Sequence, residues 1–512
     1  MKKKTIVLIS TLSVLIISFS AILSVFIVQP KYDFPLALTS IEPQDMGTKE
    51  RIEDFKFFYN VIKENYPYLI LKQRTHGFNW LNLKEYFIDK IKQADSNEEF
   101  FEILSEAITA LQNLHCTIIP YELFDYYAQI YSKYNMGAYI EVFTNKQVTD
   151  AQFYWYKITK KATQEQDYDV KIVYSKGNYT IVEGYSYNWK GKYNVSNGSI
   201  IVAVNGIPID NAIKECYRKA YLRFDPFREK IYVRIVTPKL FGENAIFTVK
   251  NTANDAMVNV TFYTFPKIWS YSSAKSNYAT KLSDDCGYVY LSSFSSMYID
   301  NDKTMLFNFY KQIENCSKLI FDIRDNFGGS TRYWRENIIE PLAKTTLKYE
   351  YYLAFRNGNY INYFRENRSI TLNMPKENVS VTLPPEVYTE DFTDLYWEEE
   401  TIEPQHQFNF DGKIYLLTSD SVYSSAESFA YVCKQTHFAE LYGTYTGGDG
   451  IGIDPIVFVL PNSKLVIRIP QVMGIKANGE ADEENFVLPD YKFESAYGDY
   501  NELIELILQE TV

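Results

Sequence analysis

A serine at the predicted start of a helix is the first candidate for chemistry in this chain. Residues 417–430 read as the end of an apolar strand, a short turn and the first turns of a helix, with Ser425 at the junction. A hydroxyl there benefits from the helix dipole, and the amide of Ala426 could donate to an oxyanion. Serine is also a favoured helix cap. This segment alone leaves both capping and nucleophilic attack open for Ser425.

Two further segments carry residues that could assist such a nucleophile. An apolar strand at 319–323 runs into Gly328 and Gly329, where missing side chains let the backbone approach a ligand and point amides at it. Taken alone, this glycine pair is equally a turn. His115 ends a predicted helix just before an apolar strand, and the chain has only 4 histidines, so candidates for a general base are few. Most isolated histidines are nevertheless structural.

Taken together, these segments resemble the tail-specific, or C-terminal-processing, serine peptidase family, in the branch that includes the tricorn core protease. The family's DLRxNxGG, SAxExFA, GxxTxGxG and final LPD elements are similar to Asp322–Gly329, Ser425–Ala430, Gly443–Gly450 and Leu488–Asp490. Their order and spacing support the resemblance over residues 280–490. It implies an α/β catalytic core of the ClpP/crotonase-like type that forms an acyl-enzyme on Ser425 without a cofactor.

The resemblance also implies the partners of Ser425, with one departure from the family pattern. Processing proteases carry a lysine base in the glycine-rich element, but Asp449 stands at that position here, and a carboxylate cannot take the place of a neutral amine. The tricorn-like branch uses a histidine and a glutamate instead. By motif position these are His115 and Glu483, with the adjacent Glu484 as an alternative.

The same resemblance implies an oxyanion hole built from backbone amides. Its donors would be the amides of Ala426 and of Gly328 or Gly329. One residue near the expected site departs from the tricorn pattern, and another belongs to the family motif but has no assigned role. Leu114 precedes the base where the tricorn pattern has a hydroxyl residue, and Glu427 occupies the first turn of the helix, where it could simply partner the helix dipole.

The N-terminal segment, residues 1–30, predicts export. Lys2, Lys3 and Lys4 precede an uncharged run over 5–28, which at 1.5 Å per residue can cross a hydrocarbon core of about 30 Å. The lysines are expected to stay inside. The long apolar run favours an uncleaved single-pass anchor with the catalytic part extracytoplasmic; a cleaved signal and a secreted protein are the alternative.

The rest of the chain divides into three predicted domains. Residues 31–120 carry helical stripes of apolar residues, and residues 121–275 read as a β-rich domain. Within the latter, 199–210 resembles the INGxPV core of PDZ-like domains, which bind peptides by strand addition; an ordinary hairpin is the alternative. Strands and helices alternate over 276–512, interrupted by a charged, Tyr-rich insertion at about 349–406 that is typical of surface decoration or a lid.

Composition excludes some classes of protein. The formal charge of −12 argues against nucleic acid as a partner, because phosphate binding needs a basic surface. The 5 cysteines form no CxxC pair and no Cys/His cluster with zinc spacing, so neither a metal site nor a disulfide framework is expected.

Three functions remain open from the sequence. The first is an extracytoplasmic serine peptidase that acts on protein or peptide substrates. The second is a catalytically inactive peptide-binding or scaffold protein that keeps the fold, since a fold does not guarantee chemistry. The third is a hydrolase of the same fold that cleaves a non-peptide ester or amide.

Overall fold

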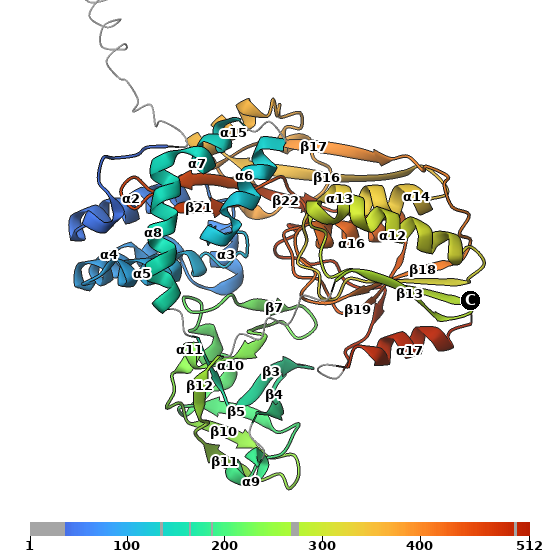
Figure 1. Cartoon of the computed structure of the whole chain (residues 1–512), viewed down its shortest axis with the longest axis horizontal. Coiled ribbons are helices and arrows are strands. Elements are labelled where there is room, and N and C mark those ends of the chain that lie inside the picture. Colours follow the sequence, from blue (N-terminus) through green and yellow to red (C-terminus); the bar gives the residue numbers. More distant parts are fainter. Residues whose placement is uncertain are drawn as a thin grey trace, which may run out of the picture.

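The computed structural model describes residues 36–133, 137–162, 165–185, 188–267, 276–495 and 499–511. Figure 1 shows three parts: helices near the N-terminus in blue and teal, a β-rich module in green below them, and a core of strands and helices in yellow to red. The predicted fold class, an α/β core with a helical N-terminal region and a β-rich domain, is confirmed.

The N-terminal region folds into helices because its apolar residues recur at helical spacing. On α5, Phe100, Ile103 and Leu104 are buried on one face, and the Ser96 hydroxyl caps the helix by accepting the Glu99 amide at 3.2 Å. The helices of this region are α2 (Thr48–Asn65), α3 (Leu69–His76), α4 (Lys84–Gln93), α5 (Asn97–Thr109), α6 (Phe124–Lys133), α7 (Gly137–Thr144) and α8 (Lys146–Ala162).

The helical region extends further than the predicted boundary at residue 120. Helices continue to Ala162, and the strands begin with β2 at Gln166. On α6, Phe124 and Tyr131 lie two turns apart and are both buried, so these aromatic residues belong to one helix face.

The β-rich module covers residues 165–267 and is built around a seven-stranded sheet. Asn205 and Gly206 both have positive φ, 50° and 78°, and join β5 to β6 in the tight hairpin that this dipeptide favours. A short helix, α10 (Ile209–Lys214), follows the hairpin. The sheet strands are β3 (Val170–Ser175), β4 (Asn178–Gly184), β5 (Ile200–Val204), β6 (Ile207–Pro208), β9 (Ile235–Val236), β10 (Phe247–Lys250) and β11 (Met257–Val260).

The core is a six-stranded sheet in the order β13-β14-β15-β18-β19-β23, parallel except for the antiparallel edge strand β13. Alternate residues of β15 explain how both faces are covered: Leu319 and Phe321 pack with α12 and α16, and Ile320 packs with α17. The elements are β13 (Tyr278–Ser283), β14 (Cys286–Tyr290), α12 (Ile299–Gln312), β15 (Lys318–Asp322), β18 (Lys413–Thr418), α16 (Ser425–Thr436), β19 (Glu440–Gly443), β23 (Tyr491–Lys492) and α17 (Asn501–Gln509).

The predicted insertion at 349–406 is an integral part of the core. Its long strands β16 (Leu347–Arg356) and β17 (Phe392–Ile402) pair with each other, and β16 also pairs with β22 (Val472–Lys476). Leu353, Ala354 and Phe355 are buried, so this part of the segment belongs to the hydrophobic core and not to the surface. Between the two strands lies α15 (Asn359–Asn367).

One small sheet joins the N-terminal region to the core. Strand β1 (Thr117–Ile118) pairs antiparallel with β21 (Val466–Ile469), which pairs with β20 (Ile456–Val459). Residues more than 300 positions apart in the sequence therefore share one ladder, which fixes the segment before β1 against the core.

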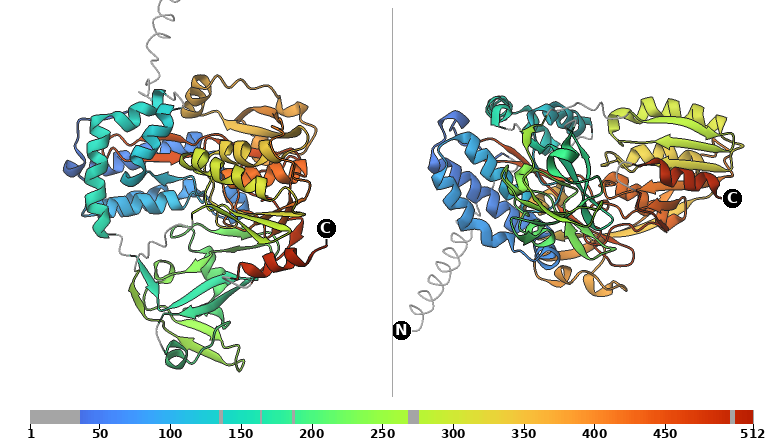
Figure 2. Two further views of the ribbon diagram at one scale, coloured as in Figure 1. Left: turned by 45° about the vertical axis from the view of Figure 1, so that its right-hand side comes forward. Right: turned by 90° about the horizontal axis from the view of Figure 1, so that it is seen from below.

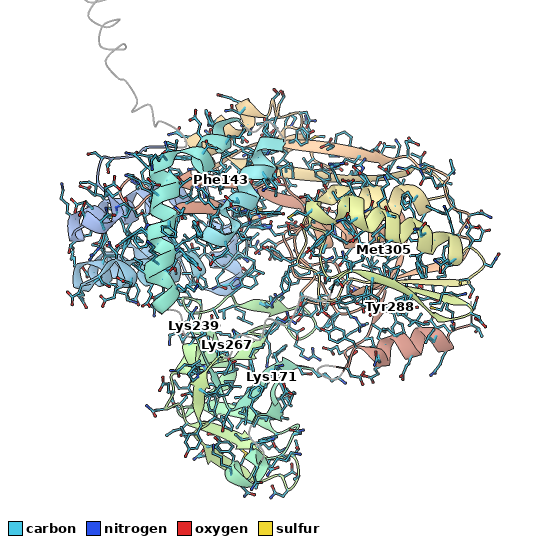
Figure 3. The ribbon with its side chains drawn as sticks, viewed as in Figure 1. Phe143, Lys171, Lys239, Lys267, Tyr288 and Met305 are labelled. Atoms are coloured by element: carbon cyan, nitrogen blue, oxygen red, sulfur yellow. The ribbon has the colours of Figure 1, made fainter. Side chains whose placement is uncertain are left out.

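The β-rich module is docked beneath the junction of these two parts. Seen from below, the green module lies between the blue helices and the core (Figure 2), and its labelled residues Lys171, Lys239 and Lys267 lie away from Phe143 of the helical region and Met305 of α12 (Figure 3). The Tyr232 hydroxyl donates to Asp420 Oδ2 at 2.7 Å, so the module contacts the turn that follows β18.

The predicted membrane anchor at residues 1–30 lies outside the described residues. Within the described part of the chain, no helix combines the length and the apolar character needed to span a bilayer. The 5 cysteines are all buried and free.

Candidate active site

The turn into α16 holds Ser424 in a strained conformation. Its φ of 56° and ψ of −130° lie in a region that residues with a side chain seldom adopt, at a cost of about 1–3 kcal/mol. The Ser424 amide donates to Gly448 O at 3.1 Å, and the Ser428 amide donates to Ser424 O at 3.0 Å. This sharp strand-to-helix turn lifts the Ser424 side chain away from the helix and leaves it partly exposed.

His115 reaches Ser424 from the N-terminal region. Its Nε2 lies 3.0 Å from Ser424 Oγ, and its backbone amide donates to Asn113 Oδ1 at 2.8 Å. The helix before it, α5, ends at Thr109, and Gln112, with a φ of 58°, turns the chain toward β1. The Asn113 side chain and the β1–β21 ladder thus hold the backbone on the two sides of His115.

Asp449 completes the line of contacts. Its Oδ2 lies 2.7 Å from His115 Nδ1 and accepts from Asn113 Nδ2 at 2.8 Å, and its Oδ1 accepts from the Tyr68 hydroxyl at 2.9 Å. The Tyr423 hydroxyl is 3.2 Å from Oδ2. A carboxylate bonded to Nδ1 fixes the tautomer with the proton on Nδ1, which leaves Nε2 free to accept the Ser424 hydroxyl.

Electrostatics keep Asp449 ionised. Burial alone raises the pKa of its carboxyl, but the charge of His115 and the hydrogen bonds from His115, Asn113 and Tyr68 outweigh burial and hold the pKa below its ordinary value. Asp449, which stands at the family's lysine position, thus contacts His115 as a charged carboxylate.

Ser425, the predicted nucleophile, faces elsewhere. Its hydroxyl accepts from Trp334 Nε1 at 3.2 Å, and the residue is buried at 5% exposure. The hydroxyl that meets His115 is that of Ser424, one residue earlier, because Ser425 is already the first residue of α16 and its side chain follows the helix. The predicted pairing of Ser425 with His115 is thus replaced by Ser424 with His115.

Of the predicted oxyanion donors, Gly329 remains available, whereas Ala426 and Gly328 do not. The Ala426 amide donates to Tyr423 O at 3.1 Å and the Gly328 amide to Asn326 Oδ1 at 2.8 Å, so both are engaged. Among the described residues, the amides of Ser425 and Gly329 have no such acceptor. Gly329 and Ser425 both line the same cavity as Ser424, which makes their amides the available donors.

Glycine is required where this second loop meets the turn. A Cβ on Gly328, whose φ is 106°, would lie 2.8 Å from Tyr423 O and 3.0 Å from the Ser425 amide nitrogen. The loop after β15 can approach the start of α16 this closely only without a side chain.

Glu483, the predicted third member, lies near the site but not on the histidine. Its Oε1 accepts from Lys72 Nζ at 2.6 Å, and its Oε2 has no hydrogen-bond partner among the described residues. Burial raises its pKa to about 8, although Lys72 opposes the shift. The alternative, Glu484, pairs with Arg74 at 2.7 Å.

Glu427 fastens the loop that carries Asp449. Its Oε2 accepts the Gly448 amide at 2.6 Å and its Oε1 the Val487 amide at 3.2 Å. A Cβ on Gly450 would lie 2.6 Å from Glu427 Cγ, so the loop and the first turn of α16 are in close contact. Burial raises the pKa of Glu427 to about 7. Glu427 therefore positions Asp449 through the backbone and does not reach His115.

The cavity at Ser424 has a volume of about 690 Å³. Its near end is formed by His115, Ser424 and Gly329. Its walls further include Tyr126, Tyr139, Tyr363, Phe364, Arg468 and Gln471. The space is large enough for several residues of an extended peptide and carries aromatic walls, as binding clefts commonly do.

No cluster of three or more His, Cys, Asp and Glu side chains suited to a metal ion occurs in the described part of the chain. The side chains of Ser424, His115 and Asp449 supply a hydroxyl, a base and an orienting carboxylate, and the backbone supplies amide donors, which is the set needed for acyl transfer.

The sequence contained a signal for Ser424. In the SAxExFA element the serine stands three residues before the glutamate, and counting back from Glu427 gives Ser424 rather than Ser425. Asp449 then follows at the spacing of about 25 residues that the family's base position has. The contact of Asp449 with His115 had no comparable signal, because the two residues lie 334 positions apart in the sequence.

The core is similar to a known protein family. Residues 285–493 match the sequence model of peptidase family S41, a family of serine peptidases. This match confirms the predicted resemblance to the tail-specific peptidases. No curated protein matches the chain.

Solved structures of similar fold cover nearly the whole chain. Mature CPAF complexed with lactacystin is 12% identical, with a TM-score of 0.54, over 90% of this chain and 97% of that one. Mature CPAF alone is 12% identical, with a TM-score of 0.54, over 90% and 96%. The D1 C-terminal processing protease of photosystem II is 12% identical, with a TM-score of 0.37, over 88% and 94%. At 12% identity the likeness to CPAF concerns the fold alone.

Proposed function

Because residues 285–493 match the sequence model of peptidase family S41, we propose that this chain is an active serine peptidase that cleaves protein or peptide substrates through an acyl-enzyme on Ser424. His115 is its general base and Asp449 orients that base. The distance of 3.0 Å between Ser424 Oγ and His115 Nε2, with Asp449 Oδ2 2.7 Å from Nδ1, carries the proposal.

The first half of the reaction acylates the enzyme. His115 Nε2 takes the hydroxyl proton as Ser424 Oγ attacks the carbonyl carbon of the scissile bond, and Asp449 stabilises the imidazolium that forms. The amides of Ser425 and Gly329 bind the oxyanion of the tetrahedral intermediate, each donor contributing about 3–4 kcal/mol of transition-state stabilisation. His115 then protonates the leaving amine, and the C–N bond breaks.

The second half releases the product. A water molecule gives its proton to His115 Nε2 and attacks the acyl carbon, and the second tetrahedral intermediate occupies the same amides. Its collapse returns the proton to Ser424 Oγ and frees the carboxylic acid. The strained Ser424 backbone favours this cycle because the side chain is held in its attacking position before substrate arrives.

Labelling with a fluorophosphonate tests the nucleophile, with neighbouring serines as matched variants. We expect mass spectrometry to find the adduct on Ser424 in the wild type, no adduct in Ser424→Ala or His115→Ala, and an adduct in Ser425→Ala. Peptide hydrolysis should follow the same pattern, with a loss on the order of 10³-fold or more for Ser424→Ala.

The alternatives give different outcomes. An adduct on Ser425 would refute the assignment of Ser424. A folded wild type that takes no label would favour the inactive scaffold. Labelling without hydrolysis of any peptide, together with hydrolysis of simple esters, would favour a non-peptide substrate.

The proposed location rests on the sequence alone. We propose that the run over 5–28 anchors the chain with its catalytic part outside the cytoplasm. Protease added to intact cells should digest the core, and carbonate washing should leave it in the membrane pellet. Protection from the protease would refute the proposed side, and release by carbonate would favour a cleaved signal.

A further inference from the structure

Arg468 is a charged side chain in the cavity without an acidic partner. It lines the cavity of Ser424, and among the described residues no carboxylate forms an ion pair with it. Its Nε is buried and has no hydrogen-bond partner. The guanidinium lies 5.7 Å from the ring of Tyr127, which supports its position but leaves its hydrogen-bond donors unused.

The strand ladder brings Arg468 close to the reacting groups. Arg468 is directly opposite Thr117 in the β1–β21 pair, and Thr117 is two residues after His115. Opposed residues in an antiparallel ladder have Cα atoms about 4.5–5.5 Å apart. Arg468 therefore stands beside the segment that carries the base, on the one partly exposed position of β21.

Gln471 provides a second unsatisfied group on the same wall. It lines the cavity, is fully buried at 0% exposure, and neither its Oε1 nor its Nε2 has a hydrogen-bond partner among the described residues. A buried carboxamide without partners costs about 1–3 kcal/mol, so this arrangement is favourable when a ligand supplies them.

The other charged residues of the cavity are paired. Arg368 bonds Asp454 at 2.9 Å, Arg332 bonds Glu336 at 2.7 Å, and Asp449 bonds His115. The positive charge of Arg468 is thus the one that remains uncompensated on the cavity wall that the structure describes, and it attracts an anion.

We propose that a carboxylate of the substrate docks on Arg468 and Gln471, so that the enzyme selects substrates with a negative charge at one fixed distance from the scissile bond. The guanidinium donates to the carboxylate oxygens, and the Gln471 amide donates a further hydrogen bond. This inference rests on the proposed peptidase function. The carboxylate is either an Asp or Glu side chain or the C-terminus of the substrate.

Paired peptides test the preference in the wild-type chain. One set of internally quenched peptides carries Asp or Asn at each position in turn, and another carries a C-terminal acid or amide. We expect kcat/KM at one position to be at least about tenfold higher for the acid than for its amide. A side-chain preference identifies the first source and a terminal preference the second. Equal rates for every pair would overturn the proposal while leaving the peptidase intact.

Substitutions then assign the preference to residues. Arg468→Met should bring the acid-to-amide ratio close to one, Arg468→Lys should retain part of it, and Gln471→Met should lower it. Arg332→Met, which removes the paired arginine of the same cavity, should keep the wild-type ratio. A ratio unchanged in folded Arg468→Met and Arg468→Lys would overturn the assignment.

Binding to an inactivated chain separates this inference from the peptidase proposal. Full-length Ser424→Ala should bind the acid peptide more tightly than its amide by calorimetry, at least about tenfold, even if no peptide is hydrolysed by the wild type. Equal affinity for the two peptides refutes carboxylate docking. Absent hydrolysis combined with selective binding refutes only the peptidase function.

Discussion

Two buried carboxylates near His115 meet opposite surroundings. Asp449 accepts hydrogen bonds from His115, Asn113 and Tyr68, and its pKa is lowered. Glu483 accepts one bond from Lys72, keeps an unpartnered oxygen, and has a pKa raised to about 8. Position in a motif made Glu483 the candidate, whereas the supply of hydrogen-bond donors makes Asp449 the residue able to stay charged beside an imidazolium.

The sharpest test of this contrast replaces each carboxylate by its amide. Asp449→Asn should lower kcat on the order of 10⁴-fold, because an amide does not fix the His115 tautomer that leaves Nε2 free for Ser424. Glu483→Gln should stay within about tenfold of wild type. Steady-state kinetics on one peptide, with circular dichroism as the folding control, gives both values.

The reverse ranking would break the comparison. A large loss in Glu483→Gln and a small one in Asp449→Asn would mean that Glu483 approaches His115 during turnover. Equal large losses would mean that the two carboxylates act as a unit.

The ion pair of Lys72 with Glu483 allows the same contrast to be tested through protein stability. The Lys72 side chain is only 6% exposed and its ion pair with Glu483 is 2.6 Å long. Lys72→Met should destabilise the protein by about 1–3 kcal/mol, because the buried carboxyl of Glu483 loses its hydrogen-bond donor. Adding Glu483→Met, which removes the unpaired carboxyl, should recover much of the loss. Thermal unfolding of the two single variants and the double variant measures the coupling; additive effects would contradict it.

The smallest expected effect is on how the melting temperature changes with pH. Glu427 and Glu483 have pKa values of about 7 and 8, against an ordinary value of 4.5. Both bind a proton more tightly in the folded than in the unfolded chain, so their contribution is complete below pH 4.5 and is lost as pH rises through 7 and 8. The melting temperature of Glu483→Gln should therefore fall less than that of wild type between pH 5.5 and 8.5. An equal fall in both proteins would contradict the raised pKa of Glu483.

The sequence predicted the elements of the core well. The strand β15 falls within one residue of the expected range 319–323, and α16 begins at the expected junction, because long apolar runs and helical periodicity are local signals. The role of β16 could not be read in the same way. Its ten residues mix buried aromatics with charged residues, and only its pairing with β17 and β22 shows that it lies inside a sheet.

The sequence predicted the histidine and the turn that meet in the structure, but it placed the nucleophile on Ser425, one residue after the serine that contacts His115. His115 was chosen because histidines are scarce, and the structure brings it to the turn where both serines lie. Ser424 and Ser425 differ by a backbone angle, φ of 56° at Ser424, that composition does not reveal. Asp449 could not be found because its partner comes from a loop 334 residues earlier.

That separation along the chain sets the moment at which the protein can first act. Asp54, on α2, accepts the amides of Asn462 and Ser463, and β1 pairs with β21, so the N-terminal helices are held by a segment that is synthesised hundreds of residues later. Until Ser424 and β21 have been synthesised, His115 has neither its proposed nucleophile nor the strand that fixes its segment against the core.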